Sequence, residues 1–248
     1  MPFAGELYKL AKESNVPIKI RACDTMGYGV PFPGASLPRS IPGIIYGLRI
    51  YAGFPSEQIE WHGHNDFYKA VVNSTTAWLY GASSVNCSLL GIGERTGNTP
   101  LEAMVIEYAQ FRGTLDGMDT TVIRDIAEYY EKELGYVIPP KTPYVGAEFN
   151  TTQAGIHADG LLKDEEIYNI FDTATLLKSP PGVSITSTSG AAGLAMWMGH
   201  NLFAGEKILK DDPRVLKLKE WVDGQYASGR VTIMTTPELL AAAGELGI

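Results

Sequence analysis

The feature that most constrains the fold is a strand-like run, a polar loop and a helical pattern that recur three times in the first half of the chain. The strand-like runs lie at 18–23, 58–60 and 83–90, and the helical patterns lie at 40–52, 66–80 and from residue 100 onward. The repeats are roughly 35 residues apart, and this alternation is typical of βα units in a parallel sheet. We therefore expect an α/β fold.

Polar side chains gather in the loops that follow the three runs. Asp24 and Thr25 follow the first run, His62 and His64 the second, and residues 94–98 the third. In parallel α/β folds and (β/α)8 barrels the active site is built at the carboxyl ends of the strands. We expect these loops to open onto one face.

His62 and His64 have the spacing of a metal site at the end of a strand. Residues i and i+2 of a strand point to the same side, so two imidazoles can face one divalent ion. The alternative is that one or both are core or surface histidines with ordinary hydrogen bonds.

Capping residues predict where three helices begin. Ser40 and Asp66 are placed to cap two of them. Thr99 and Glu102 match a capping box, with Pro100 as the first helical residue.

Composition excludes several classes of protein. The net charge is −8 and the Lys and Arg residues are scattered, which argues against nucleic acid as a partner. The chain has no run of 18 apolar residues and no basic, then apolar start, so we expect neither a membrane span nor a secretory signal. Cys23 and Cys87 lie in strand-like runs, and we interpret them as reduced thiols of a cytoplasmic protein.

The second half of the chain has a different pattern. A helix is predicted at 121–134, and three prolines among residues 139–143 then forbid both helix and central strand. We predict a barrel-like catalytic region at 1–136 and a helical region of short helices and turns at 137–248.

Four motifs in register carry a family resemblance. They are Asp24-Thr25-x-Gly-Tyr, His62-x-His-Asn-Asp, Gly91-x-Gly-Glu-Arg-Thr-Gly-Asn and Gly155-Ile-His-Ala-Asp-Gly. Their order and spacing resemble those of 2-isopropylmalate and homocitrate synthases, which are HMG-CoA-lyase-like TIM-barrel metalloenzymes. Within that group the chain looks most like the Re-type citrate synthases, from the segments 61–67 and 28–40.

The resemblance implies a metal and substrate site. His62, His64 and Asn98 match ligands of a divalent metal, Mn²⁺ or Mg²⁺. Thr25 matches a residue that holds the carboxylate of a 2-oxo acid, although a strand-end cap is the alternative reading.

Two neighbouring residues of the third loop match the same site. The resemblance groups Glu94 with the catalytic residues and Arg95 with the substrate-binding residues, or makes both structural partners of the site. The competing reading is an exposed ion pair, which contributes only ~0–1 kcal/mol to stability.

The resemblance also implies a reaction and a dimer. The enol of acetyl-CoA would attack the ketone of the 2-oxo acid, with His157 taking the methyl proton and Tyr168 hydrogen-bonding nearby. In the family these two residues belong to a helical lid that serves the neighbouring protomer, which implies a homodimer with swapped lids.

Two departures qualify this picture. The family's first-strand motif, with an Asp ligand and an Arg, is absent, and only about three βα units are present. We therefore expect the C-terminal part of a (β/α)8 barrel followed by a lid, either as a fragment or as one half of a split enzyme. In addition, residues 86–90 differ from the Glu-Gly-Thr pattern of isopropylmalate synthases, which disfavours 2-oxoisovalerate as the substrate.

The sequence leaves several functions open. The first is condensation of acetyl-CoA with oxaloacetate to give citrate, and the alternatives in the same class are homocitrate and isopropylmalate synthesis. The hypothesis from another class is a catalytically silent chain that completes a barrel.

Overall fold

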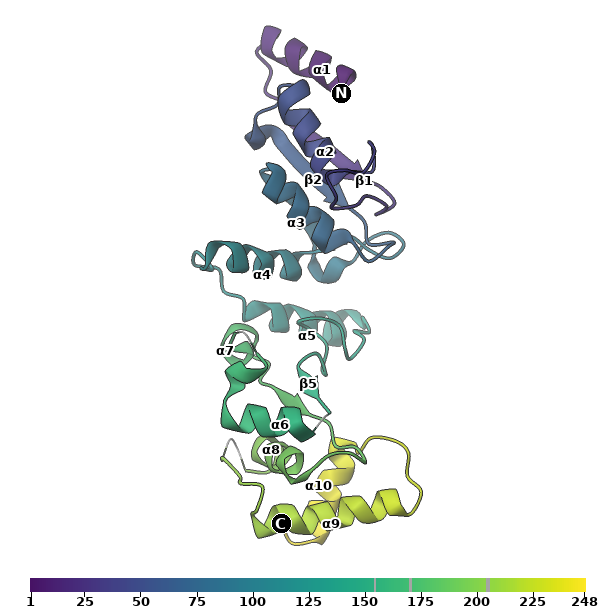
Figure 1. Ribbon diagram of the computed structural model, residues 1–248, viewed down its shortest axis with the longest axis vertical. Coiled ribbons are helices and arrows are strands. Elements are labelled where there is room, and N and C mark those ends of the chain that lie inside the picture. The colour runs from purple at the N-terminus through teal and green to yellow at the C-terminus, as the bar shows by residue number, and fades with distance from the viewer. Residues whose placement is uncertain (154, 170, 204–205) are drawn as a thin grey trace. The chain divides into compact units, whose positions relative to one another are not determined.

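The computed structural model describes residues 1–153, 155–169, 171–203 and 206–248 (Figure 1). The chain forms two compact units, Met1–Met118 and Asp119–Ile248, which are described separately. None of the helices in these described ranges is long and apolar enough to cross a lipid bilayer.

The first unit combines helices with short strands. Its α-helices are α1 (Pro2–Glu13), α2 (Ile41–Tyr46), α3 (Ala70–Tyr80) and α4 (Leu101–Arg112). Its strands are β1 (Ile20–Asp24), β2 (Ile59–Gly63), β3 (Ser84–Ser88) and β4 (Thr99–Pro100). Short 3-10 or π turns occupy Gly47–Tyr51, Ser56–Gln58 and Leu89–Gly91.

The four strands form one parallel sheet in the order β1-β2-β3-β4. Asp24 is in register with Gly63, and His62 with both Cys23 and Asn86. The predicted parallel α/β fold is confirmed, and the carboxyl ends of the strands meet at one edge. The short β4 was not predicted.

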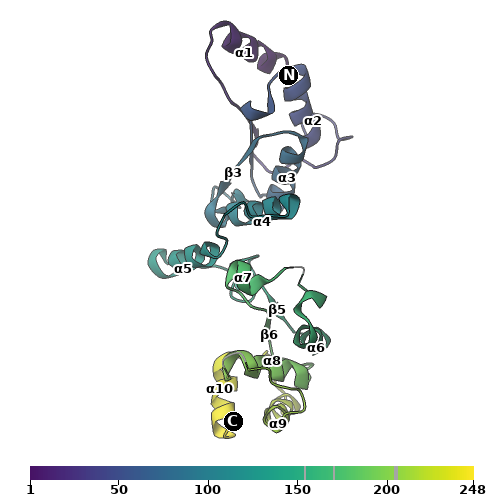
Figure 2. The same cartoon turned by 90° about the vertical axis from the view of Figure 1, so that its left-hand side faces the viewer.

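The two faces of the sheet differ because side chains alternate along a strand. Ile59 and Trp61 are buried against apolar residues of α2 and α3. Helices α3 and α4 lie beside β3 (Figure 2). The opposite side of β1 carries exposed Arg21 and exposed Cys23.

Of the predicted helix caps, only the one at Ser40 is confirmed. Its hydroxyl accepts a hydrogen bond from the Gly43 amide at 3.0 Å. Asp66 is not a cap, because α3 begins at Ala70 with Lys69 in the cap position.

The capping box at α4 is also wrong, since both side chains have partners elsewhere. The Thr99 hydroxyl lies 2.8 Å from the Ser74 hydroxyl. The buried Glu102 carboxylate accepts a hydrogen bond from the Leu90 amide at 3.1 Å. Burial raises the pKa of Glu102.

The second unit is mainly helical. Its α-helices are α5 (Val122–Leu134), α6 (Gly155–Lys163), α7 (Thr173–Leu177), α8 (Ala191–Asn201), α9 (Pro213–Ala227) and α10 (Thr236–Glu245). A 3-10 turn lies at Glu165–Ile167, and the strands β5 (Thr151–Thr152) and β6 (Gly182–Val183) pair in parallel.

Helix α5 belongs to the second unit, although the sequence places it in the first domain. The Thr120 hydroxyl donates to the Leu176 carbonyl at 2.7 Å, and the Lys178 ammonium donates to the Asp125 carboxylate at 2.8 and 2.9 Å. The compact units thus divide after Met118. The domain limits 1–136 and 137–248 stay a prediction.

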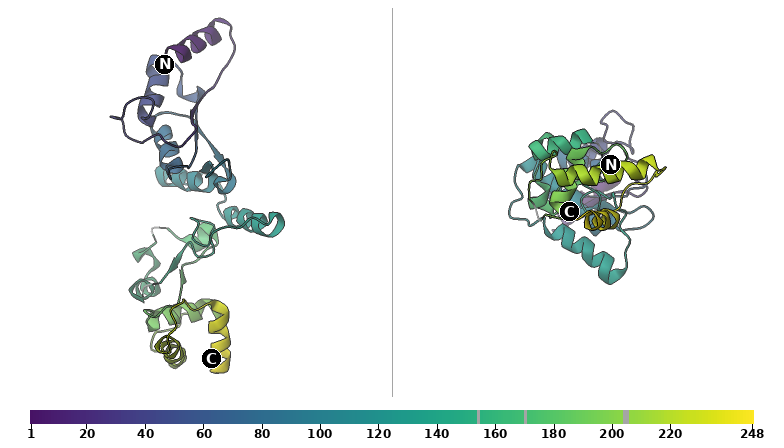
Figure 3. Two further views of the ribbon diagram at one scale, coloured as in Figure 1. Left: turned by 90° about the vertical axis from the view of Figure 1, so that its right-hand side faces the viewer. Right: turned by 90° about the horizontal axis from the view of Figure 1, so that it is seen from below.

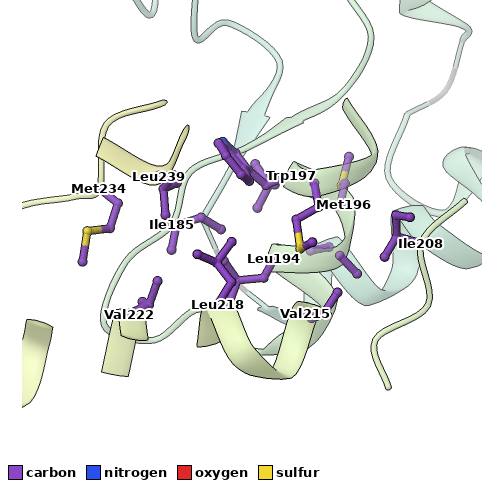
Figure 4. Packing of buried hydrophobic residues seen from close by; sticks show 14 of the residues in the cluster. Ile185, Leu194, Met196, Trp197, Ile208, Val215, Leu218, Val222, Met234 and Leu239 are labelled. Atoms are coloured by element: carbon purple, nitrogen blue, oxygen red, sulfur yellow. The ribbon is translucent and has the colours of Figure 1, made fainter. Parts of the chain in front are cut away.

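The core of the second unit surrounds α8, with α9 and α10 at its side (Figure 3). Leu194, Trp197 and Leu218 are among its buried side chains (Figure 4). Helices α9 and α10 each begin after a side-chain cap, which is Asp212 for α9 and Thr235 for α10.

Candidate functional site

The two histidines at the end of β2 face each other. His62 is in the strand and His64 follows it, and their Nε2 atoms lie 3.1 Å apart. The two rings are nearly perpendicular, at 81°. The expectation that both imidazoles point to one place is confirmed.

Asn86 on β3 fixes the tautomer of His62. Its Oδ1 lies 2.8 Å from His62 Nδ1. An amide oxygen can only accept, so Nδ1 carries the proton and Nε2 keeps its lone pair. Oxygen partners of this kind orient histidines that bind metals in proteins.

The donor atoms fit a divalent cation. Adjacent ligands of an octahedral ion bound at about 2.1 Å lie about 3 Å apart, close to the 3.1 Å between the two Nε2 atoms. Asn98 Oδ1 is buried and has no hydrogen-bond partner in the described part of the chain. Among those residues no group of three or more His, Cys, Asp or Glu side chains forms a metal cluster. The groups here that could hold an ion are therefore the two imidazoles and the Asn98 amide oxygen.

Glycines allow the three loops to pack closely around these donors. A Cβ on Gly27, whose φ is +62°, would lie 2.3 Å from the His64 carbonyl oxygen. A Cβ on Gly93 would lie 2.5 Å from Asn98 Oδ1. The backbones of His64 and Asn98 form an antiparallel bridge. This close packing holds the His64 segment against the first loop and against Asn98.

The first loop is held by Asp24. Its carboxylate accepts hydrogen bonds from the backbone amides of Tyr28 at 3.0 Å and Gly29 at 2.9 Å. The Asn73 amide donates to the Gly29 carbonyl at 3.0 Å. Thr25 directly follows the carboxyl end of β1, and it is exposed.

Arg95 of the third loop contacts the other two loops. Its Nε donates to Asp66 Oδ1 at 2.8 Å, and its Nη2 donates to the Thr25 carbonyl. The hydrogen bond from Arg95 lowers the pKa of Asp66. Glu94 lies 3.6 Å from Arg95 with its side chain 84% exposed.

The second unit brings His157 and Tyr168 together. Their ring centroids are 4.6 Å apart, and the Thr152 hydroxyl lies 3.1 Å from His157 Nδ1. These residues line an open cavity of about 240 Å³. A Cβ on Gly160 would lie 2.4 Å from Tyr168 Cε2, so a larger residue there would displace the Tyr168 ring from its present position.

The sequence did not predict three contacts of these sites. They are the contact of Asn86 with His62, the ion pair of Asp66 with Arg95, and the contact of Thr152 with His157. Strand register would have found Asn86, because it is paired with His62 across two parallel strands. The other two have no signal in the local pattern, since their partners are set by how the loops fold.

Comparison with known proteins agrees with this architecture. A parallel α/β sheet with its polar side chains at the carboxyl edge defines the class to which the first unit belongs. The HMGL-like family model matches residues 2–129, and the chain belongs to this family.

Curated relatives are similar over nearly the whole chain. It is 57% identical to a citrate (Re)-synthase of Clostridium kluyveri over 96% of its length, and 53% identical to one of Syntrophus aciditrophicus over 97%. A 2-phosphinomethylmalate synthase of Streptomyces hygroscopicus is 39% identical over 89%. The chain spans only 53%, 39% and 50% of those proteins, so it corresponds to about half of such a relative or less.

Proposed function

We propose that this chain is the C-terminal part of an acyltransferase that condenses acetyl-CoA with oxaloacetate to give citrate. The proposal is supported by the names of two relatives that are more than 50% identical and by the family. The observation that carries it is the pair of facing Nε2 atoms, 3.1 Å apart, with Asn86 holding His62 in the tautomer that exposes a lone pair.

His62, His64 and Asn98 would hold a divalent ion, Mn²⁺ or Mg²⁺. When bound, such an ion acts as a Lewis acid that polarises the ketone of the 2-oxo acid. Thr25 would bind the carboxylate of that acid, with Glu94 and Arg95 beside it. The donor set, two imidazoles and an amide oxygen, suits an ion that keeps open positions for a substrate.

His157 would act as the base that removes a proton from the methyl group of acetyl-CoA. With the Thr152 hydroxyl as acceptor of the Nδ1 proton, Nε2 would be the nitrogen that takes the proton from the methyl group. The methyl carbon would then attack the ketone carbon of oxaloacetate, whose oxygen takes up a proton to become a hydroxyl. Water would then break the C–S bond of the thioester, which gives the new carboxylate and releases the CoA thiol. Tyr168 would hydrogen-bond at the same place.

The architecture that follows is a partial barrel. We propose that the first unit forms the last βα units of a (β/α)8 barrel and that the second unit is a helical lid. A homodimer with swapped lids would bring His157 of one protomer to the metal site of its partner. A cytoplasmic location fits the exposed Cys23 thiol.

The test is thiol release from acetyl-CoA with Mn²⁺ across oxaloacetate, 2-oxoglutarate, 2-oxoisovalerate and pyruvate. We expect release with oxaloacetate alone. Release only with 2-oxoglutarate would replace the proposal by homocitrate synthesis, and release only with 2-oxoisovalerate would replace it by isopropylmalate synthesis.

The second candidate is a silent partner that completes a barrel with another chain. Its support is that the chain spans about half or less of its relatives. No thiol release with any acid, together with release after addition of the polypeptide encoded beside it, would favour this candidate.

A further inference from the structure

One guanidinium joins the three loops at the carboxyl edge of the sheet. Arg95 belongs to the loop after β3, and it donates to Asp66 in the loop after β2 and to the Thr25 carbonyl in the loop after β1. A second bond runs from Arg95 Nη2 to Asp66 Oδ2 at 3.4 Å. The ion pair is therefore bidentate, and two parallel hydrogen bonds fix the orientation of the guanidinium relative to the carboxylate.

This pair differs from an ordinary surface ion pair. The side chains of Arg95 and Asp66 are only 35% and 12% exposed, so solvent screens them less than most charges on the surface. The hydrogen bond to Asp66 raises the pKa of Arg95. Two of the three guanidinium nitrogens, Nε and Nη2, therefore donate hydrogen bonds to groups of the protein.

The backbone of Arg95 is in an unusual conformation. Its φ is +56°, in the left-handed region that costs an L-residue about 1–2 kcal/mol. Backbone hydrogen bonds on either side hold this conformation. The Asn65 backbone amide donates to the Gly97 carbonyl at 2.9 Å, and the Asn98 backbone amide donates to the Gly91 carbonyl at 2.9 Å. The turn at Arg95 brings Asn98 back beside His64.

We infer that Arg95 is a positioning residue, which clamps the loop of Asn98 onto the loops of His64 and Thr25 and so sets the affinity of the metal site. The inference rests on the proposed metal site. It gives Arg95 a different task from binding the substrate carboxylate, because its donors already have partners in the protein.

The experiment compares Mn²⁺ binding to the full chain and to three variants by calorimetry. Arg95→Met should weaken binding about 10–100-fold, as loss of a partner that orients metal ligands does. Arg95→Lys should recover part of the affinity, because an ammonium can pair with Asp66 but cannot also reach the Thr25 carbonyl. Arg21→Met is the matched control, since it removes an ion pair of the same 2.8 Å length, to Glu60, and should leave binding unchanged.

A second measurement is independent of the metal. Hydrogen exchange at the Asn65 and Asn98 amides should be faster in the metal-free Arg95→Met variant than in the parent and in Arg21→Met. Unchanged exchange would overturn the clamp, and so would faster exchange with unchanged Mn²⁺ affinity. A parent chain that binds no Mn²⁺ would instead refute the proposed metal site, and the exchange data would still decide whether Arg95 joins the loops.

A direct substrate role for Arg95 has its own signature. It would raise the KM for the 2-oxo acid in Arg95→Met while leaving Mn²⁺ affinity as it is. That result would overturn the positioning role.

Discussion

Gly27→Ala tests how tightly the first loop packs on the histidine segment. A Cβ there would lie 2.3 Å from the His64 carbonyl oxygen, and ordinary contacts of a Cβ begin at 3.4 Å. Backbone must therefore move by about 1 Å, and strain of this kind costs typically about 1–3 kcal/mol. The left-handed φ of +62° adds about 1–2 kcal/mol for any L-residue.

Gly113→Ala is the matched control for this substitution. Gly113 has a φ of +70° and nothing within 4 Å of an added Cβ, so it carries the conformational cost without the collision. We expect Gly113→Ala to destabilise the first unit by about 1–2 kcal/mol and Gly27→Ala by about 2–5 kcal/mol.

Hydrogen exchange in a urea series, read by mass spectrometry on peptides of β2, measures the opening of the first unit separately from the second. The difference between the two variants is the quantity of interest, because both lose the same glycine flexibility in the unfolded chain. Equal destabilisation by the two substitutions would refute the packing of the first loop on His64.

Two further predictions concern the site and the C-terminal helix. Asn86→Leu should weaken Mn²⁺ binding about 10–100-fold by calorimetry, because His62 loses the acceptor that fixes its tautomer, and unchanged affinity would contradict that role. Arg230 lowers the pKa of Glu238 to about 2, from the ordinary 4.5. The pair therefore stabilises α10 fully above about pH 4.5, and this contribution is lost as the pH falls toward 2. As the pH falls from 4.5 to 2, the midpoint temperature of thermal unfolding should decrease less steeply in Glu238→Gln than in the parent. Equal decreases in the two proteins would contradict this role of the pair.

The sheet could be predicted because its signal is local. Apolar runs followed by helical patterns identify β1, β2 and β3, and the parallel arrangement follows from their spacing. The two-residue strand β4 at Thr99–Pro100 has no periodicity to detect. The second strand was expected to end at the two histidines, and β2 does end there, at Gly63.

The helix caps show where local reading fails. Asp66 and Glu102 have the residue types and positions of caps, yet their partners are Arg95, 29 residues away, and Leu90, 12 residues away. A buried carboxylate without a hydrogen bond costs free energy, so such a side chain pairs with donors that the fold brings to it from distant parts of the chain. The predicted meeting of the histidines depended only on strand geometry, and it is confirmed.

The two cysteines make the open side of the sheet measurable. Burial raises the pKa of the Cys87 thiol to about 11, so at neutral pH it stays protonated and slow to alkylate. Cys23 is exposed and in register with His62. Anything that covers this side of the sheet, such as the further strands of the proposed barrel, would shield Cys23. The alkylation rate of the Cys23 thiol, measured by mass spectrometry, therefore reports whether this side of the sheet is covered. The measurement does not depend on enzymatic activity.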